Sequence, residues 1–135
     1  MSDARDHARE RYVLVVEDDR DIRDTIVEIL ESEGYAVKTA CDGDAAIAQM
    51  RQARPAVVLL DLAMPRVRGE DVRKIQLADR SLRGIPTVVM SAADRLAERC
   101  VELAPAEVLA KPIRLADLLA VVRRFCIPPA AGAPA

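Results

Sequence analysis

Residues 56–69 read AVVLLDLAMPRVRG, and this stretch does most to decide the fold. Its first five residues, Ala56–Leu60, form a continuous apolar run, which is typical of a strand buried on both faces. The run stops at Asp61, and a loop leads from there to a helical pattern near Glu70–Asp79. A buried strand followed by a helix is the unit from which parallel sheets are built, so the stretch predicts an α/β fold.

The same unit recurs on both sides of this stretch. The predicted strands are Tyr12–Val16, Tyr35–Thr39, Ala56–Leu60, Pro86–Met90 and Glu107–Ala110. Each is followed by a predicted helix, and these helices end near Glu33, Ala53, Asp79, Leu103 and Phe125. This repeated alternation of strand and helix predicts one parallel sheet with helices on both faces.

The length and composition are typical of one globular domain. The chain has 135 residues, of which 51% are hydrophobic and 31% are charged. No apolar run approaches the roughly 18 residues of a membrane-spanning helix, and the polar N-terminus is unlike a signal peptide, so we expect a cytoplasmic protein with no membrane partner. We expect residues 1–10 to be a polar leader, residues 11–126 the folded domain, and the Pro/Ala-rich residues 127–135 a disordered tail.

The charge and the few cysteine and histidine residues argue against several classes of function. A net charge of −2 offers no basic field for a nucleic-acid backbone, so no direct nucleic-acid partner is expected. The three cysteines are widely spaced without a CxxC pair, which argues against a disulfide framework and a zinc site. The one histidine, His7, lies in the leader, which argues against a Ser-His-Asp site.

Charged and polar residues follow the predicted strands where each strand ends. They are Glu17 and Asp18 after the first strand, Asp61 after the third, Ser91 after the fourth and Lys111 after the fifth. Because ligands of open α/β sheets bind beyond the carboxyl ends of the strands, we expect these side chains to form a site. Three converging carboxylates require a cation, a raised pKa or both, and an all-oxygen site open to water suits Mg²⁺ better than Zn²⁺.

Each of these residues alone also has an ordinary structural interpretation. The acidic run at 17–19 is suited to capping the first helix, and Asp61 is suited to closing a strand. Ser91 is of a type common in loops and caps, and Lys111 is of a type common on solvated surfaces. The functional prediction therefore depends on all of them lying at the same edge of the sheet.

The spacing after the third strand adds a motif. Residues 61–69 read D-x-x-M-P-x-x-x-G, and a Lys-Pro pair follows the fifth strand at Lys111. Together with the acidic pair after the first strand and the serine after the fourth, this pattern resembles the CheY-like receiver domain of two-component response regulators. The resemblance extends from about Arg11 to Cys126 and implies a doubly wound, flavodoxin-like (βα)5 sandwich with strand order 2-1-3-4-5.

The resemblance implies a phosphoryl-transfer function for the strand ends. Asp61 matches the family's phosphoacceptor, which takes a phosphoryl group from a phosphohistidine on a sensor histidine kinase or a histidine phosphotransfer protein. Lys111 would contact a phosphoryl oxygen, and Ser91 would hydrogen-bond to the phosphoryl group. Such a protein promotes its own phosphorylation and dephosphorylation and is not an ordinary enzyme.

A metal site is implied by the same resemblance. Mg²⁺, with Mn²⁺ as an alternative, would bind Asp18 directly and Glu17 mostly through water. Asp61 and the backbone carbonyl of Ala63 would complete the protein ligands. A divalent cation and an ammonium group supply the positive charge that phosphoryl transfer requires around the equatorial oxygens.

Three departures from the family pattern affect the expected mode of signalling. Val108 stands where the family usually has Tyr or Phe, and Ala104-Pro105 stands where Gly-Ala is common, which stiffens the turn before the fifth strand. Ser91 and Lys111 are slightly closer in sequence than in the family, which predicts a shortened fourth helix or a shortened loop before it. Every residue that the chemistry needs is present.

We expect a stand-alone receiver that signals by phosphorylation-dependent binding to a downstream protein, and the family's fourth helix, fifth strand and fifth helix form the face for a homodimer. The alternatives are the N-terminal receiver of a longer regulator whose output domain is absent from this chain, and a degenerate receiver that acts only as a binding module.

Two other classes of protein are disfavoured. An FMN-binding flavodoxin is disfavoured because the acidic run at 17–19 repels phosphate. A haloacid-dehalogenase-type phosphatase is disfavoured because position 63 is Ala and not a second Asp.

Overall fold

The computed structural model describes residues 12–63, 69–92 and 103–126. The predicted leader and tail lie outside these residues, as does the predicted helix at Asp94–Leu103 apart from Leu103 itself. None of the helices in the described ranges combines the length and the apolar character that a bilayer crossing demands.

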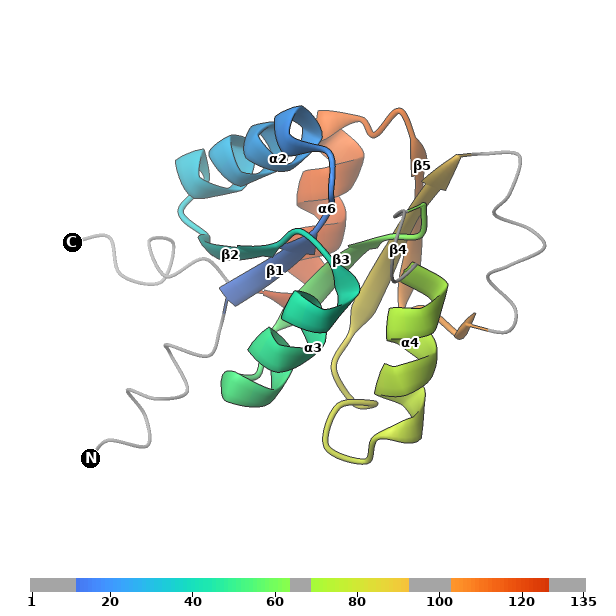
Figure 1. Ribbon diagram of the computed structural model, residues 1–135. Helices are drawn as coiled ribbons and strands as arrows, with labels where there is room; N and C mark the ends of the chain where they lie inside the picture. The colour runs from blue at the N-terminus through green and yellow to red at the C-terminus, as the bar shows by residue number, and fades with distance from the viewer. Residues whose placement is uncertain (1–11, 64–68, 93–102, 127–135) are drawn as a thin grey trace, which may run out of the picture.

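Parallel strands form one sheet in the order β2-β1-β3-β4-β5 (Figure 1). The strands are β1 (Tyr12–Val16), β2 (Ala36–Ala40), β3 (Val57–Asp61), β4 (Thr87–Ala92) and β5 (Glu107–Lys111). Every residue of β1 and β3 is buried, as their continuous apolar runs predict. The strand order and direction confirm the predicted flavodoxin-like fold class.

Helices cover both faces of this sheet (Figure 1). Those in the described residues are α2 (Arg20–Ser32), α3 (Gly43–Gln52), α4 (Gly69–Ala78) and α6 (Leu115–Phe125). α2 and α6 lie on one face, and α3 and α4 lie on the other. Because strand side chains alternate between the faces, Val13 and Val15 of β1 join the α2–α6 core, whereas Leu14 and Val16 join the α3–α4 core.

Aspartates cap α2 and α3, the helices that begin just after the carboxyl ends of β1 and β2. Asp19 caps α2 by accepting a hydrogen bond from the Ile22 N–H at 3.1 Å. Asp42 caps α3 by accepting one from the Ala45 N–H at 2.8 Å. Each cap satisfies a helix N–H group that has no partner within the helix. The caps therefore fix how the chain leaves β1 and β2 at the edge where the predicted site residues gather.

Four strands, β2 to β5, extend beyond their predicted ends, and in three of them the extension includes a predicted site residue. Asp61, Ser91 and Lys111 were expected to follow β3, β4 and β5, but each lies within its strand. The cause is pairing between neighbouring strands, since Asp61 pairs with Met90 and Ser91 pairs with Ala110. Sequence patterns detect the apolar runs but not these pairs, so the predicted strands stop where the polar residues begin. The added ladder positions hold the site residues on rigid backbone.

The first residue of α4 packs directly against the backbone of the predicted phosphoacceptor. A Cβ atom on Gly69 would lie 2.2 Å from the Asp61 carbonyl oxygen and 2.7 Å from the Leu62 Cα. Both distances are far inside van der Waals contact, and backbone atoms have little freedom to move aside. The glycine of the D-x-x-M-P-x-x-x-G motif is therefore required for the close approach of α4 to β3.

We predict that Gly69→Ala lowers the free energy of unfolding by about 1–3 kcal/mol, because the new methyl group forces α4 away from β3. Urea unfolding followed by circular dichroism measures this change. Gly84→Ala is the matched control, since its Cβ would meet only the flexible end of the Arg54 side chain, at 3.1 Å. It should stay within about 0.5 kcal/mol of the parent chain. Equal losses in both variants would contradict the importance of the α4–β3 contact.

Candidate functional site

Three carboxylates converge at the carboxyl edge of the sheet. Glu17 and Asp18 follow β1, and Asp61 ends the adjacent strand β3. One carboxylate oxygen from each lies within 4.8 Å of the others. Glu17 and Asp61 are each 1% exposed, whereas Asp18 is exposed. The predicted convergence is therefore confirmed, with two carboxylates in the floor of the site and one at its mouth.

The turn after β1 holds Glu17 in place through several backbone contacts. The Glu17 N–H donates to the Ala40 carbonyl at 3.2 Å, which continues the pairing of β1 with β2. The Glu17 Oε2 accepts from the Asp19 N–H at 3.2 Å, and the Glu17 carbonyl accepts from Arg23 at 3.0 Å. The contribution of Arg23 was not predicted, because nothing in the sequence distinguishes it from Arg20, the other arginine of α2.

Lys111 joins the carboxylates from β5. Its Nζ donates a hydrogen bond to the Asp61 Oδ1 at 3.0 Å and lies 3.5 Å from the Glu17 Oε1. The Ala63 N–H donates to the same Asp61 oxygen at 3.1 Å. The Lys111 side chain is only 26% exposed, so water screens these ion pairs less than it screens pairs on the open surface. The structure thus brings the predicted lysine to the predicted phosphoacceptor.

Ser91 lies at the same edge but is not joined to this group. It is 4% exposed in β4, the strand between Asp61 and Lys111. Its ladder partner is Ala110, the residue before Lys111. Within the described residues, no hydrogen bond links Ser91 to Asp61. The structure therefore places Ser91 in the neighbouring strand, and its contact with a phosphoryl group stays a prediction.

The electrostatics of the site favour binding of a cation. The pKa of Glu17 is raised to about 7, mainly by burial and in smaller part by the hydrogen bond and the charge of Asp61, while Lys111 and the Asp19 N–H oppose the rise. Burial opposes the charge of Lys111, but the hydrogen bond to Asp61 and the charges of Asp61 and Glu17 outweigh it and raise the pKa of Lys111. The Glu17 Oε1 is buried and accepts no hydrogen bond from the described residues. Among the described residues, the Lys111 ammonium group pairs with Glu17 and Asp61, and the three grouped carboxylates form an all-oxygen donor set that fits Mg²⁺.

The raised pKa of Glu17 predicts an unusual pH dependence for the metal-free protein. Between pH 4.5 and about 7 the folded chain keeps a proton on Glu17 that the unfolded chain releases, so stability should fall as the pH rises through this window and then level off. Melting temperatures in EDTA at pH 5 and pH 8 measure this, with Glu17→Gln as the variant that loses the dependence. The raised pKa of Lys111 acts only above its ordinary value of 10.5 and does not contribute here. Mg²⁺ should raise the melting temperature more at pH 8 than at pH 5, because protons compete with the ion for Glu17. If the melting temperatures of the parent chain and of Glu17→Gln depended equally on pH, the assignment of this dependence to Glu17 would be contradicted.

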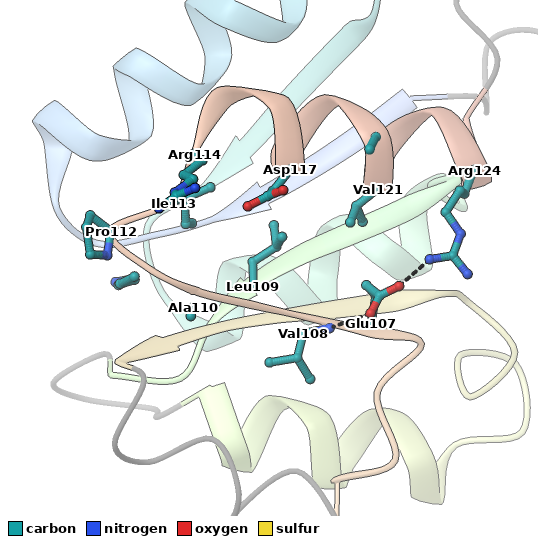
Figure 2. Close-up of a pocket in the computed structure, with 12 residues that line it drawn as sticks. Glu107, Val108, Leu109, Ala110, Pro112, Ile113, Arg114, Asp117, Val121 and Arg124 are labelled. Atoms are coloured by element: carbon teal, nitrogen blue, oxygen red, sulfur yellow. Dashed lines mark hydrogen bonds and ion pairs between the residues drawn. The ribbon is translucent and has the colours of Figure 1, made fainter.

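Two grooves border the site. One, of about 600 Å³, lies between α2 and the start of α6 and reaches Lys111. It carries Ile22 and Leu115, which are exposed large apolar residues. The other, of about 620 Å³, lies along β5 and α6 (Figure 2). Both grooves therefore reach Lys111, the cation of the site.

Along the β5–α6 groove, neighbouring side chains of β5 point to opposite faces of the sheet. Leu109 points toward α6, whereas Val108 points to the opposite side of β5 (Figure 2). Val108 packs there against the apolar cluster of Leu62, Val89 and Leu103. An ion pair between Glu107 and Arg124 joins the start of β5 to the end of α6. The position that carries an aromatic residue in the resembled family is thus a small, partly buried contact here.

Comparisons with known proteins agree with this geometry. The family model described as "Response regulator receiver domain" matches residues 13–123. Sensory transduction protein RegX3 and response regulator MprA, both of Mycobacterium tuberculosis, are 35% and 37% identical to the chain over 113 and 117 residues. Each match covers 82% of the chain but 48% of the relative, so the chain spans about half the length of the curated relatives it matches.

Solved structures show the same architecture. Chemotaxis response regulator CheY4 of Vibrio cholerae superposes with a TM-score of 0.77 at 26% identity, covering 85% of this chain and 98% of that one. The receiver domain of NtrX from Brucella abortus superposes with a TM-score of 0.75 at 29% identity, covering 84% and 96%. The similarity therefore extends over nearly the whole described domain.

Proposed function

The chain belongs to the response regulator receiver domain family, and we propose that its Asp61 accepts a phosphoryl group from a phosphohistidine on a histidine kinase or a histidine phosphotransfer protein. The observation that carries the proposal is the buried Asp61 carboxylate, which is hydrogen-bonded by Lys111 and grouped with two further carboxylates. The FMN-binding and phosphatase alternatives lose their support, because the family match covers residues 13–123.

The transfer step follows from the groups around Asp61. A carboxylate oxygen of Asp61 attacks phosphorus in line with the P–N bond of the donor, so that a P–O bond forms and the electron pair of the P–N bond returns to the imidazole. Lys111 lies close enough to Asp61 to offset the negative charge of the phosphoryl oxygens. Water later attacks phosphorus, the P–O bond to Asp61 breaks with its electron pair returning to the carboxylate, and inorganic phosphate leaves with the oxygen of the water. Ser91 donates a hydrogen bond to the phosphoryl group once it is attached.

Mg²⁺ is the proposed cofactor, and Mn²⁺ is an alternative of equal charge. Asp18 would bind the ion directly and Glu17 mostly through water, with Asp61 and the Ala63 carbonyl as the remaining protein ligands. The buried Glu17 Oε1 supports this role, because it is an acceptor that lacks a hydrogen bond within the described residues. When bound, the ion supplies positive charge against the phosphoryl oxygens. A degenerate receiver is the alternative here, and it would bind no Mg²⁺ in a titration.

We propose that the phosphorylated state is recognised through a protein–protein contact of the face predicted for the fourth helix, β5 and α6, of which β5 and α6 lie within the described residues (Figure 2). The first form of the proposal is a stand-alone receiver in the cytoplasm that binds a downstream protein or a second copy of itself. The half-length matches to RegX3 and MprA favour a second form, in which this face contacts an output domain of a longer regulator. Sedimentation with Mg²⁺ and beryllofluoride, which mimics the phosphoryl group, tests the homodimer. An unchanged monomer mass would exclude it.

The direct test of the proposed function uses phosphoramidate, a small donor with a P–N bond. Intact-mass spectrometry should show one phosphoryl group per chain in the presence of Mg²⁺. The product should be lost with hydroxylamine, which cleaves acyl phosphates, and should not form with EDTA. A Mg²⁺-bound protein that takes up no phosphoryl group would overturn the proposal.

A further inference from the structure

A buried arginine on α4 holds the turn that precedes β5. Arg73 is 4% exposed, and all three of its guanidinium nitrogens donate hydrogen bonds. Its Nε donates to the Leu103 carbonyl at 2.8 Å, and its Nη2 donates to the Ala104 carbonyl at 2.7 Å. Its Nη1 donates to the Gln76 Oε1 at 2.9 Å. Burial lowers the pKa of Arg73, so these oxygens stabilise a charge that the protein interior disfavours.

The arginine belongs to a wider buried network. Gln76, which is fully buried, donates from its Nε2 to the Leu82 and Ile85 carbonyls at 3.2 Å each. The Thr87 hydroxyl at the start of β4 donates to the Gln76 Oε1 at 3.0 Å. The network thus joins α4, the loop before β4 and the first residue of β4. Arg73 extends it to the chain that enters β5.

The turn that Arg73 holds has a backbone conformation that needs support. Ala104 has a φ of 44°, in the left-handed region that residues with a side chain rarely adopt. Pro105 follows it and restricts the chain further. Beyond the turn, the Ala106 N–H donates to the Thr87 carbonyl at 2.8 Å. The two carbonyl contacts of Arg73 therefore fix a strained turn immediately before β5.

The same elements also contact the phosphoacceptor. α4 begins at Gly69, which packs on the Asp61 and Leu62 backbone. Leu103 belongs to the buried cluster that contains Leu62, the residue after Asp61, and Val108 of β5 packs against that cluster. Leu103 is therefore held by Arg73 through its carbonyl and packed in the Leu62 cluster through its side chain. A displacement at Asp61 has a direct physical route to β5 through these contacts.

We propose that Arg73 is a positioning residue that fixes the Leu103–Ala104 turn and thereby couples the state of Asp61 to β5. The coupling rests on the proposed function of Asp61, whereas the holding of the turn does not. Val108 contributes an apolar contact to this route. The hydrogen bonds of Arg73 to the Leu103 and Ala104 carbonyls are its polar contacts, and they fix the orientation of the turn. The effect of Arg73 is on the response of β5, and the chemistry at Asp61 does not require it.

The first test measures how Arg73 holds the turn without any phosphoryl analogue. Hydrogen exchange of the Ala106 and Val108 amides should become about tenfold faster in Arg73→Leu, because the two carbonyls lose their donors. Amides of β1 serve as the reference for global unfolding and should change much less. Lys74→Leu, an exposed position on the same helix, is the matched control and should leave Ala106 unchanged. Unchanged exchange at Ala106 in Arg73→Leu would overturn the proposal.

A second background keeps the test decisive if Arg73→Leu folds poorly. Ala104→Gly removes the cost of the positive φ, so the turn should depend less on Arg73. Arg73→Lys keeps the charge but loses the forked geometry and should accelerate Ala106 exchange by about threefold. In the Ala104→Gly background the same change should have an effect of less than about twofold. Equal effects in both backgrounds would contradict the holding of a strained turn.

The coupling is tested with Mg²⁺ and beryllofluoride. In the parent chain, exchange should change both at residues 57–62 and at Ala106 and Val108. In Arg73→Leu the change at 57–62 should persist, and the change at Ala106 and Val108 should disappear. A full response at Ala106 in that variant would overturn the coupling. A parent chain that responds at 57–62 only would overturn the coupling but not the proposed function, and one that responds nowhere would overturn both.

Discussion

Replacing Asp61 with asparagine is expected to reduce phosphoryl labelling by at least about 100-fold, to the background of the assay. The amide has no anionic oxygen with which to attack phosphorus, and the hydrogen bond from Lys111 would meet a neutral acceptor. Labelling with phosphoramidate and Mg²⁺, followed by intact-mass spectrometry, measures the loss.

The control for this variant is an aspartate outside the site. Asp24→Asn removes an exposed carboxylate of α2 whose partner is Arg20, and labelling should stay at the parent level. Circular dichroism of both variants establishes that the fold is retained. Labelling of Asp61→Asn at the parent stoichiometry would contradict the assignment of the phosphoacceptor.

The second large effect is expected at Lys111. Lys111→Met should slow labelling by about 100-fold, because its ammonium group is a charged donor that contacts the Asp61 carboxylate at 3.0 Å. Mg²⁺ affinity at pH 8 should be retained or increased, because the change removes a positive charge that lies beside Glu17 and Asp61. The two measurements separate a role in the transfer step from a role in binding the metal.

Labelling rates at saturating Mg²⁺ and a calorimetric titration with Mg²⁺ provide these two numbers. Lys74→Met, an exposed lysine on α4, is the matched control and should change neither. Loss of labelling that simply follows a loss of Mg²⁺ binding would show that Lys111 acts on the metal site and not on the transfer.

The convergence of Glu17, Asp18, Asp61 and Lys111 could be predicted because parallel strands bring their carboxyl ends to one edge. The apolar runs identify the strands, and the first polar residue after each run is then a site candidate. The strand ends themselves were placed one or two residues short at Asp61, Ser91 and Lys111, since ladder pairing with a neighbouring strand leaves no local signal.

The contacts of Arg73 and Gln76 could not be predicted from the sequence. On an amphipathic helix, polar residues are expected on the side that faces solvent, yet the side chains of Arg73 and Gln76 are both buried. Their partners are mostly backbone carbonyls from distant segments, which no residue pattern reveals. The sequence identifies Gly69 as part of the motif, but it does not predict why a glycine is needed there. The close contact with the Asp61 carbonyl is seen only in the structure.

The position of Val108 shows the same limit. The sequence indicates that the family's aromatic residue is missing, but not what replaces its contacts. The structure places Val108 against the cluster of Leu62, Val89 and Leu103, next to the turn that Arg73 holds. The contacts of β5 at this position are therefore apolar packing against that cluster and a neighbouring turn held by backbone hydrogen bonds, not an aromatic side chain.

Identifying the phosphorylated residue is the most direct test of the assignment of Asp61. After labelling with phosphoramidate and Mg²⁺, borohydride reduction converts an aspartyl phosphate to homoserine, which peptide mass spectrometry locates. Homoserine at position 61, and at no other aspartate, is the predicted result. Homoserine at Asp18 or another aspartate, or a phosphoryl group found on His7, would contradict the central claim that Asp61 is the phosphoacceptor.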